Sequence, residues 1–145
     1  MTRAWSALMV AVAVAGCTPD PVDSPFHEIR TDSAPLTTRF PAIGTPVSAR
    51  WVTWHSEDAA VPGPTTYWID AVLTLNPQTT ATLTGLDPTA QGRTPSVAEA
   101  LRPEVSDGPF LTGPALDAAM SAHGWTAGAY LDAARNQLVL NAFDD

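Results

Sequence analysis

Residues 67–75 most constrain the fold, because their side chains alternate with the two-residue period of a β-strand. One face of this predicted strand carries the apolar set Tyr67, Ile69, Ala71, Leu73 and Leu75. The other face carries the mixed set Trp68, Asp70, Val72 and Thr74. We expect the first set to face the core, so the chain must supply a sheet and a layer that covers it.

Further strands are predicted on both sides of this segment. Residues 50–55 are rich in aromatic and β-branched residues, which favours a strand. Residues 128–132 and 137–143 predict a C-terminal hairpin around residues 133–136, where Asn136 tolerates a left-handed backbone. The chain is therefore expected to contain two hairpins.

Three helices are predicted between the hairpins. The first begins after Asn76, a favourable cap followed by proline, and ends at Gly85. The second begins at a capping box over residues 96–99 and ends before Pro103, and the third spans residues 114–123. The order of elements predicts an α+β fold, a small antiparallel sheet of two hairpins with helices packed on one face.

Residues 17–47 contain many prolines among Thr, Ser and Asp, and their few apolar residues follow no clear period. Such composition favours an extended spacer with a rise of about 3.1 Å per residue, enough to hold a domain about 90 Å from a membrane. The alternative is that part of this segment, between Phe26 and Phe40, binds a partner or packs back on the domain. Residues 48–145 are then the folded domain.

The N-terminus combines Arg3, a short apolar run over residues 7–15 and small residues at its end, which is typical of a cleaved signal peptide. The run is too short to span a bilayer, which needs about 20 residues. Its end, Val14-Ala15-Gly16-Cys17, resembles the lipobox of bacterial lipoproteins. The resemblance implies removal of residues 1–16, a diacylglycerol thioether on Cys17, and anchoring at the outer face of the bacterial cytoplasmic membrane. An ordinary secreted protein is the alternative.

Charge and cysteine content narrow the classes of partner. All fifteen acidic residues follow Cys17, against six arginines, so the mature chain carries a side-chain charge of about −9. Such a surface repels phosphate backbones, which argues against nucleic acid as a partner. It also argues against electrostatic binding to anionic lipid, so membrane attachment is expected through the lipid on Cys17. The single cysteine is then lipidated and leaves no disulfide or catalytic thiol.

A candidate binding surface surrounds the first predicted hairpin. Aromatic rings stack on flat ligands and carboxylates accept hydrogen bonds, so the two together suit a sugar or a peptide. The residues of this surface are Trp51, Trp54, His55, Glu57, Asp58, Tyr67, Trp68 and Asp70. The alternative is that the rings pack in the core and on the sheet while the acids are solvated.

Other chemistries have little support. No paired His spacing accompanies His55 for a metal site, and no nucleophile elbow, phosphate-binding loop or lysine is present. No cofactor or metal is therefore expected. The leading hypothesis is a non-catalytic binding or accessory module that contacts another envelope protein. The runner-up is a cell-wall glycan or small-ligand binding protein. Less favoured are an enzyme with His55 and Asp70 or Asp58 as acid and base, and a purely structural protein.

Overall fold

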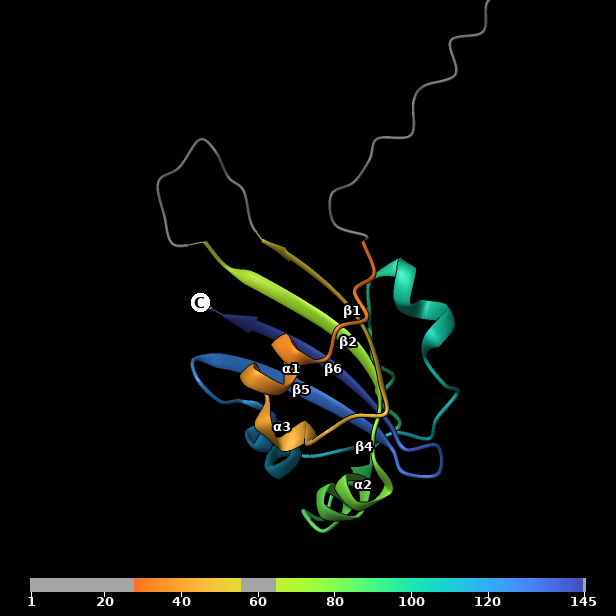
Figure 1. The fold of residues 1–145 in the computed structure, drawn as a ribbon. Helices are drawn as coiled ribbons and strands as arrows, with labels where there is room; N and C mark the ends of the chain where they lie inside the picture. Colours follow the sequence, from red (N-terminus) through yellow and green to blue (C-terminus); the bar gives the residue numbers. More distant parts are fainter. Residues whose placement is uncertain (1–27, 56–64, 145) are drawn as a thin grey trace, which may run out of the picture.

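A computed structural model describes residues 28–55 and 65–144. Their centre is a six-stranded sheet in the order β1-β2-β6-β5-β4-β3, antiparallel at every pairing (Figure 1). The long strands are β1 (Ser48–His55), β2 (Tyr67–Thr74), β5 (Trp125–Asp132) and β6 (Gln137–Asp144), and β3 (Thr89–Ala90) and β4 (Leu111–Thr112) are short. Both predicted hairpins are confirmed, and β2 and β6 lie at the centre of the four long strands.

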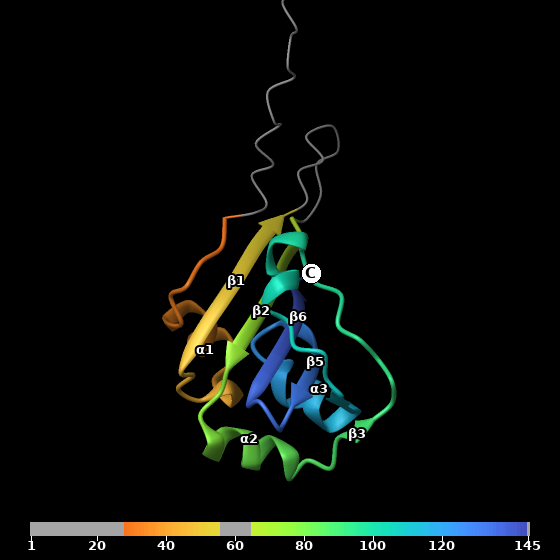
Figure 2. The same cartoon turned by 90° about the vertical axis from the view of Figure 1, so that its right-hand side faces the viewer.

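The α-helices cover one face of the sheet, as Figures 1 and 2 show for α1 (Ala34–Arg39) and α3 (Pro114–Met120), while α2 (Pro77–Thr84) lies across one end. Their apolar side chains join those of β1, β2, β5 and β6 in the larger core. The fully buried members include Leu36, Phe40, Ile43, Leu73, Leu116, Met120, Leu131 and Leu138. The predicted α+β class is thus confirmed, with α1 and α3 as the helical layer on this face.

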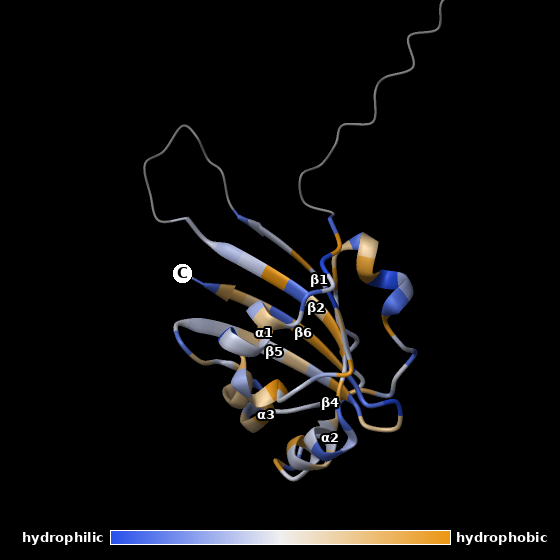
Figure 3. Ribbon diagram, viewed as in Figure 1, coloured by the Kyte–Doolittle hydropathy of each residue, from blue (hydrophilic) through white to orange (hydrophobic). Residues whose placement is uncertain are grey.

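The opposite face is covered by the segment that contains the 3-10 helix η2 (Glu99–Glu104), which Figure 2 shows beside β1 and β2. A smaller core lies beneath it, formed by Val52, Val72, Val97, Leu101, Phe110 and Val139. In Figure 3, hydrophobic residues mark the central strands, and η2 carries both hydrophobic and polar residues. Both faces of the sheet are therefore buried, which explains why Asp70 and Val72 on the second, mixed face of β2 are buried as well.

Residues 34–43 belong to the folded domain. We had predicted an extended spacer over residues 17–47, and for these residues that prediction is wrong. Leu36, Phe40 and the 3-10 helix η1 (Pro41–Ile43) place three fully buried side chains on the sheet. These apolar positions are spaced i, i+4 and i+7, the period of one helix face. Pro35 and Pro41 occupy the first turns of α1 and η1, where proline is well tolerated, so they start helices here.

Three helix ends differ from expectation. One of them is the end of η2, which reaches Glu104 with Pro103 inside it, although we expected this helix to end before Pro103. Asn76 caps α2 through its side-chain oxygen, which accepts from the Gln78 amide at 3.1 Å, as predicted. The capping box at Ser96 does not form, because Ala98 is the N-cap of η2 and its amide bonds to Asp70 instead. Helix α3 ends at Met120, three residues early, and His123 adopts a left-handed backbone with φ of 56°.

Helix α3 also protects an exposed edge of the sheet. Strand β4 pairs with β5 only at Leu111 and Leu131, so the first half of β5 has no neighbouring strand on that side. Side chains of α3 and its C-cap replace it: Asp117 Oδ1 accepts from the Ala129 amide at 2.9 Å, and Ser121 Oγ accepts from the Ala127 amide at 2.9 Å. These contacts satisfy buried amides that would otherwise template another strand.

Within residues 28–55 and 65–144, no helix is both long enough and apolar enough to cross a bilayer.

Candidate functional site

The pleat of the β1–β2 hairpin separates the predicted binding surface into two groups. Trp54 lies opposite Trp68, and His55 lies opposite Tyr67, so the two pairs point to opposite faces of the sheet. Trp51 and Tyr67 share the face of α1, while Trp68 and Asp70 share the face of η2. Glu57 and Asp58 lie outside the described residues. The predicted surface is therefore not a single platform.

Trp51 is a core residue and only 2% exposed. Its indole N–H donates to the Asp32 carbonyl at 2.9 Å, and the Arg30 guanidinium lies 4.3 Å from the ring centroid. Arg30 also pairs with Trp51 through two backbone hydrogen bonds of 2.8 and 3.0 Å. This ring fixes residues 30–32 against β1, so its role is structural.

Trp54 and Trp68 stack on each other on the opposite face, with centroids 6.2 Å apart and planes inclined by 13°. Both rings are half-buried, and Trp54 packs against the smaller core. The two rings therefore pack on the sheet, as the alternative interpretation of the sequence expected, and they also leave a partly accessible surface.

Asp70 is buried and ties three segments together. Its carboxylate accepts from the Ala98 amide at 2.8 Å and from Asn141 Nδ2 at 2.7 Å, and the same Asn141 nitrogen donates to the Ser96 carbonyl at 2.8 Å. The carboxylate thus fastens the start of η2 to β2 and β6. Burial raises the pKa of Asp70 and outweighs the hydrogen bonds from Asn141 and Ala98, which lower it.

This raised pKa predicts a pH dependence of stability. Because the folded chain favours the protonated carboxyl, its stabilising effect is complete below the ordinary pKa of 3.8 and is lost as pH rises through the raised value. The measurement that checks this dependence is the free energy of unfolding of the wild type and of Asp70→Asn, each at pH 3 and at pH 7. The advantage of the wild type over the variant should be smaller at pH 7. An advantage that grows with pH would contradict this role.

A pocket of about 630 Å³ opens on the other face, at the ends of the four long strands. Strand pairing places Tyr67, Asp144 and Trp125 in one row, because Asp144 lies opposite both rings. The residues around the pocket are Arg30, Pro35, Arg39, Trp51, Thr53, Tyr67, Ile69, Trp125 and Asp144. Of these, sequence reasoning had selected Trp51 and Tyr67 as site residues.

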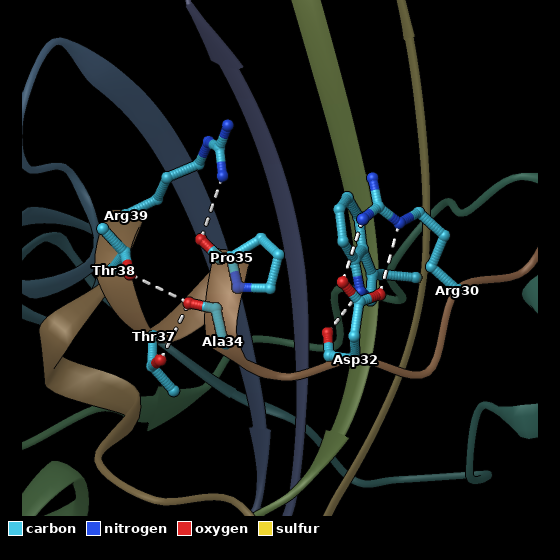
Figure 4. A network of polar contacts seen from close by, with 8 residues as sticks. Arg30, Asp32, Ala34, Pro35, Thr37, Thr38 and Arg39 are labelled. Atoms are coloured by element: carbon cyan, nitrogen blue, oxygen red, sulfur yellow. Dashed lines mark hydrogen bonds and ion pairs between the residues drawn. The ribbon is translucent and has the colours of Figure 1, made fainter.

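Arg39 supplies positive charge to the pocket. Its Nη1 donates to the Pro35 carbonyl at 3.1 Å, one turn back on α1, and its guanidinium carbon lies 5.9 Å from the Trp125 ring centroid. Figure 4 shows this side chain extending from α1 beside Pro35. No carboxylate among the described residues forms an ion pair with it, and a guanidinium carries five N–H donors. Most of its donors therefore remain available to a ligand.

Arg30, in contrast, already has an acidic partner. Its Nε and Nη2 donate to the two carboxylate oxygens of Asp32 at 3.2 and 2.9 Å, as Figure 4 shows. The Arg30 hydrogen bonds lower the pKa of Asp32, which stays ionised at neutral pH. Asp32 thus neutralises the charge of Arg30 on one side of the pocket, and Arg39 is the pocket cation whose donors are mostly unused.

Aromatic rings complete the pocket. Trp125 is half-buried and meets the buried ring of Phe40 edge to face at 5.8 Å, so its position depends on the residue that follows α1. Tyr67 is 45% exposed and contacts His55, with centroids 5.7 Å apart. We predicted that this strand begins at residue 128, but β5 begins at Trp125. A prediction that began at Trp125 would have selected Trp125 and Asp144, which ends the partner strand β6, as candidate site residues.

The groups around this pocket are suited to binding a ligand. Among the described residues, no three His, Cys, Asp or Glu side chains gather closely enough to hold a metal ion. The pocket instead offers one available cation, one acid and two accessible rings. In comparisons with known proteins, no family model, curated protein or solved structure matches the chain. The function must therefore be inferred from the pocket itself.

Proposed function

We propose that this protein is a non-catalytic binding module that captures a small ligand in the pocket between α1 and the strand ends. The observation that carries the proposal is Arg39, a half-buried guanidinium held over Trp125 with most of its donors unused. Lipidation of Cys17 would hold the module at the outer face of the cytoplasmic membrane, since the sequence before it resembles a lipobox.

Size and composition support a small ligand. Pockets for small molecules measure about 300–1,000 Å³ and combine apolar walls with a few convergent polar groups. This pocket has about 630 Å³, aromatic walls and polar groups from Arg39, Thr53 and Asp144. These features favour the runner-up hypothesis from the sequence, a wall-glycan or small-ligand binding protein.

Thermal unfolding of the full chain with a panel of small compounds tests the proposal. The panel contains neutral sugars, sugar acids, amino acids, short peptides and glycerol phosphate. A compound that binds only the folded chain raises its Tm, and at 100-fold excess over Kd the stabilisation is about 2.7 kcal/mol. We expect at least one class to raise Tm by several degrees, and Tyr67→Ala to abolish the shift.

Val47→Ala is the matched control, because Val47 is 71% exposed and does not line the pocket. Its ligand-induced shift should equal that of the wild type. Absence of a shift for every class would contradict the proposed pocket function.

A second candidate function is docking to another envelope protein through the Trp54–Trp68 stack. The observation in its favour is that both rings stay half-buried at one end of the β1–β2 hairpin. In that case, Trp54→Ala would remove a recurrent in-cell cross-link to one membrane protein while leaving the thermal shifts unchanged.

A further inference from the structure

We infer that the ligand of this pocket is a sugar acid, a pyranose ring that carries a carboxylate. The inference rests on the proposed binding function and assigns its ligand class. It follows from three features of the same pocket: the row of side chains across the sheet, the position of Arg39, and the sign of the surrounding charge.

The row across the sheet matches a ring with hydroxyl groups. Tyr67, Asp144 and Trp125 occupy facing positions on the adjacent strands β2, β6 and β5. Adjacent strands are about 4.8 Å apart, so the two aromatic residues lie about 10 Å apart with the acid between them. Aromatic faces bind the apolar faces of a sugar ring, and the Asp144 carboxylate accepts hydrogen bonds from hydroxyl or amide N–H groups.

Arg39 then selects an acidic sugar over a neutral one. Its guanidinium lies on the Trp125 side of the row, and the Pro35 carbonyl holds it at 3.1 Å. A guanidinium binds a carboxylate through two parallel N–H···O hydrogen bonds, and its orientation here is already restricted. The acid group of the ligand is therefore expected at Arg39 and the ring hydroxyls at Asp144.

The surrounding charge favours a carboxylate over a phosphate. A phosphate monoester carries between one and two negative charges at neutral pH, whereas a carboxylate carries one. Asp144 lines the same pocket, and the whole chain has a formal net charge of −8. Repulsion thus opposes a phosphate more strongly, and Arg39 is the only pocket cation among the described residues without an acidic partner.

Ligand-observed NMR titration of the full chain with two matched sugars tests the inference. N-acetylmuramic acid differs from N-acetylglucosamine by an ether-linked lactyl group that bears a carboxylate, so the pair isolates the acid. We expect the acid to bind at least about tenfold more tightly, because a hydrogen bond to a charged group contributes about 1.5–3 kcal/mol. Arg39→Gln should remove this preference, so that the two sugars bind the variant equally.

Arg93→Gln is the control, because it changes the net charge equally, is exposed and does not line the pocket. It should keep the preference for the acid. Equal binding of both sugars, or a preference that survives Arg39→Gln, would overturn the inference while leaving the binding function in place. Tighter binding of glycerol phosphate than of N-acetylmuramic acid would overturn it in favour of a phosphate ligand. If no compound of the wider panel binds, the proposed function fails as well.

Discussion

Phe40→Ala is expected to lower the free energy of unfolding by about 3–5 kcal/mol, the usual cost of removing a buried phenylalanine ring. Phe40 is fully buried and touches Trp125 edge to face, so the cavity would open between α1 and β5. The same change should weaken ligand binding, because α1 positions Arg39 over Trp125. Chemical denaturation followed by circular dichroism measures the first effect.

Phe40→Leu and Val47→Ala complete this test. The leucine variant keeps most of the apolar contact, so its loss should be clearly smaller than that of the alanine variant. Val47 is 71% exposed, and truncating it should change stability by less than about 0.5 kcal/mol. An alanine variant at Phe40 as stable as the wild type would show that residues 34–43 are not part of the folded domain.

Asp117→Ala combined with Ser121→Ala is expected to lower the free energy of unfolding by about 2–6 kcal/mol, since each buried amide left without an acceptor costs about 1–3 kcal/mol. The amides concerned belong to Ala127 and Ala129, which are at most 5% exposed. The open edge of β5 should also pair between molecules. We therefore expect association that depends on protein concentration, measured by sedimentation.

Two further double variants separate this effect from loss of side-chain hydrogen bonds in general. Asp117→Asn with Ser121→Thr keeps an acceptor oxygen at both positions and should sediment like the wild type. Thr37→Ala with Thr38→Ala removes two exposed hydroxyl bonds to the Ala34 carbonyl and should change stability little. If the alanine pair at 117 and 121 behaves like the pair at 37 and 38, the side chains of α3 do not protect the edge.

Local patterns predicted the fold well where burial and backbone chemistry agree. The strand over residues 67–74, the Asn76 cap and the left-handed Asn136, with φ of 52°, are each determined by neighbouring residues. Prediction failed where a distant residue decides the outcome. The Asp70 carboxylate accepts from the Ala98 amide, which is 28 positions away in the sequence. A capping rule that considers only residues 96–99 cannot predict this contact. Leu36, Phe40 and Ile43 follow a helical period that we did not predict, because the many prolines of this segment favoured an extended spacer.

The candidate site was harder to predict, because a sheet separates residues that are neighbours in sequence. The selected aromatic residues came from one hairpin, and the pleat sends Trp54 and Trp68 to one face and Trp51 and Tyr67 to the other. The pocket instead gathers Tyr67, Asp144 and Trp125 across three strands, and Arg39 from a helix before them all. Only the strand order and register bring these residues together.

The attachment of Arg30 to β1 limits how far the pocket can travel from an anchored N-terminus. Two backbone hydrogen bonds fix Arg30 to Trp51, and both residues line the pocket. With lipid on Cys17, about 13 residues separate the anchor from this point, and such a chain spans at most about 45 Å. Under the proposed lipidation of Cys17, a connection of this length gives an effective concentration in the millimolar range for ligands displayed at the membrane surface. Weak intrinsic affinity would then suffice for high occupancy there, while the same ligand farther out in the wall would stay beyond reach.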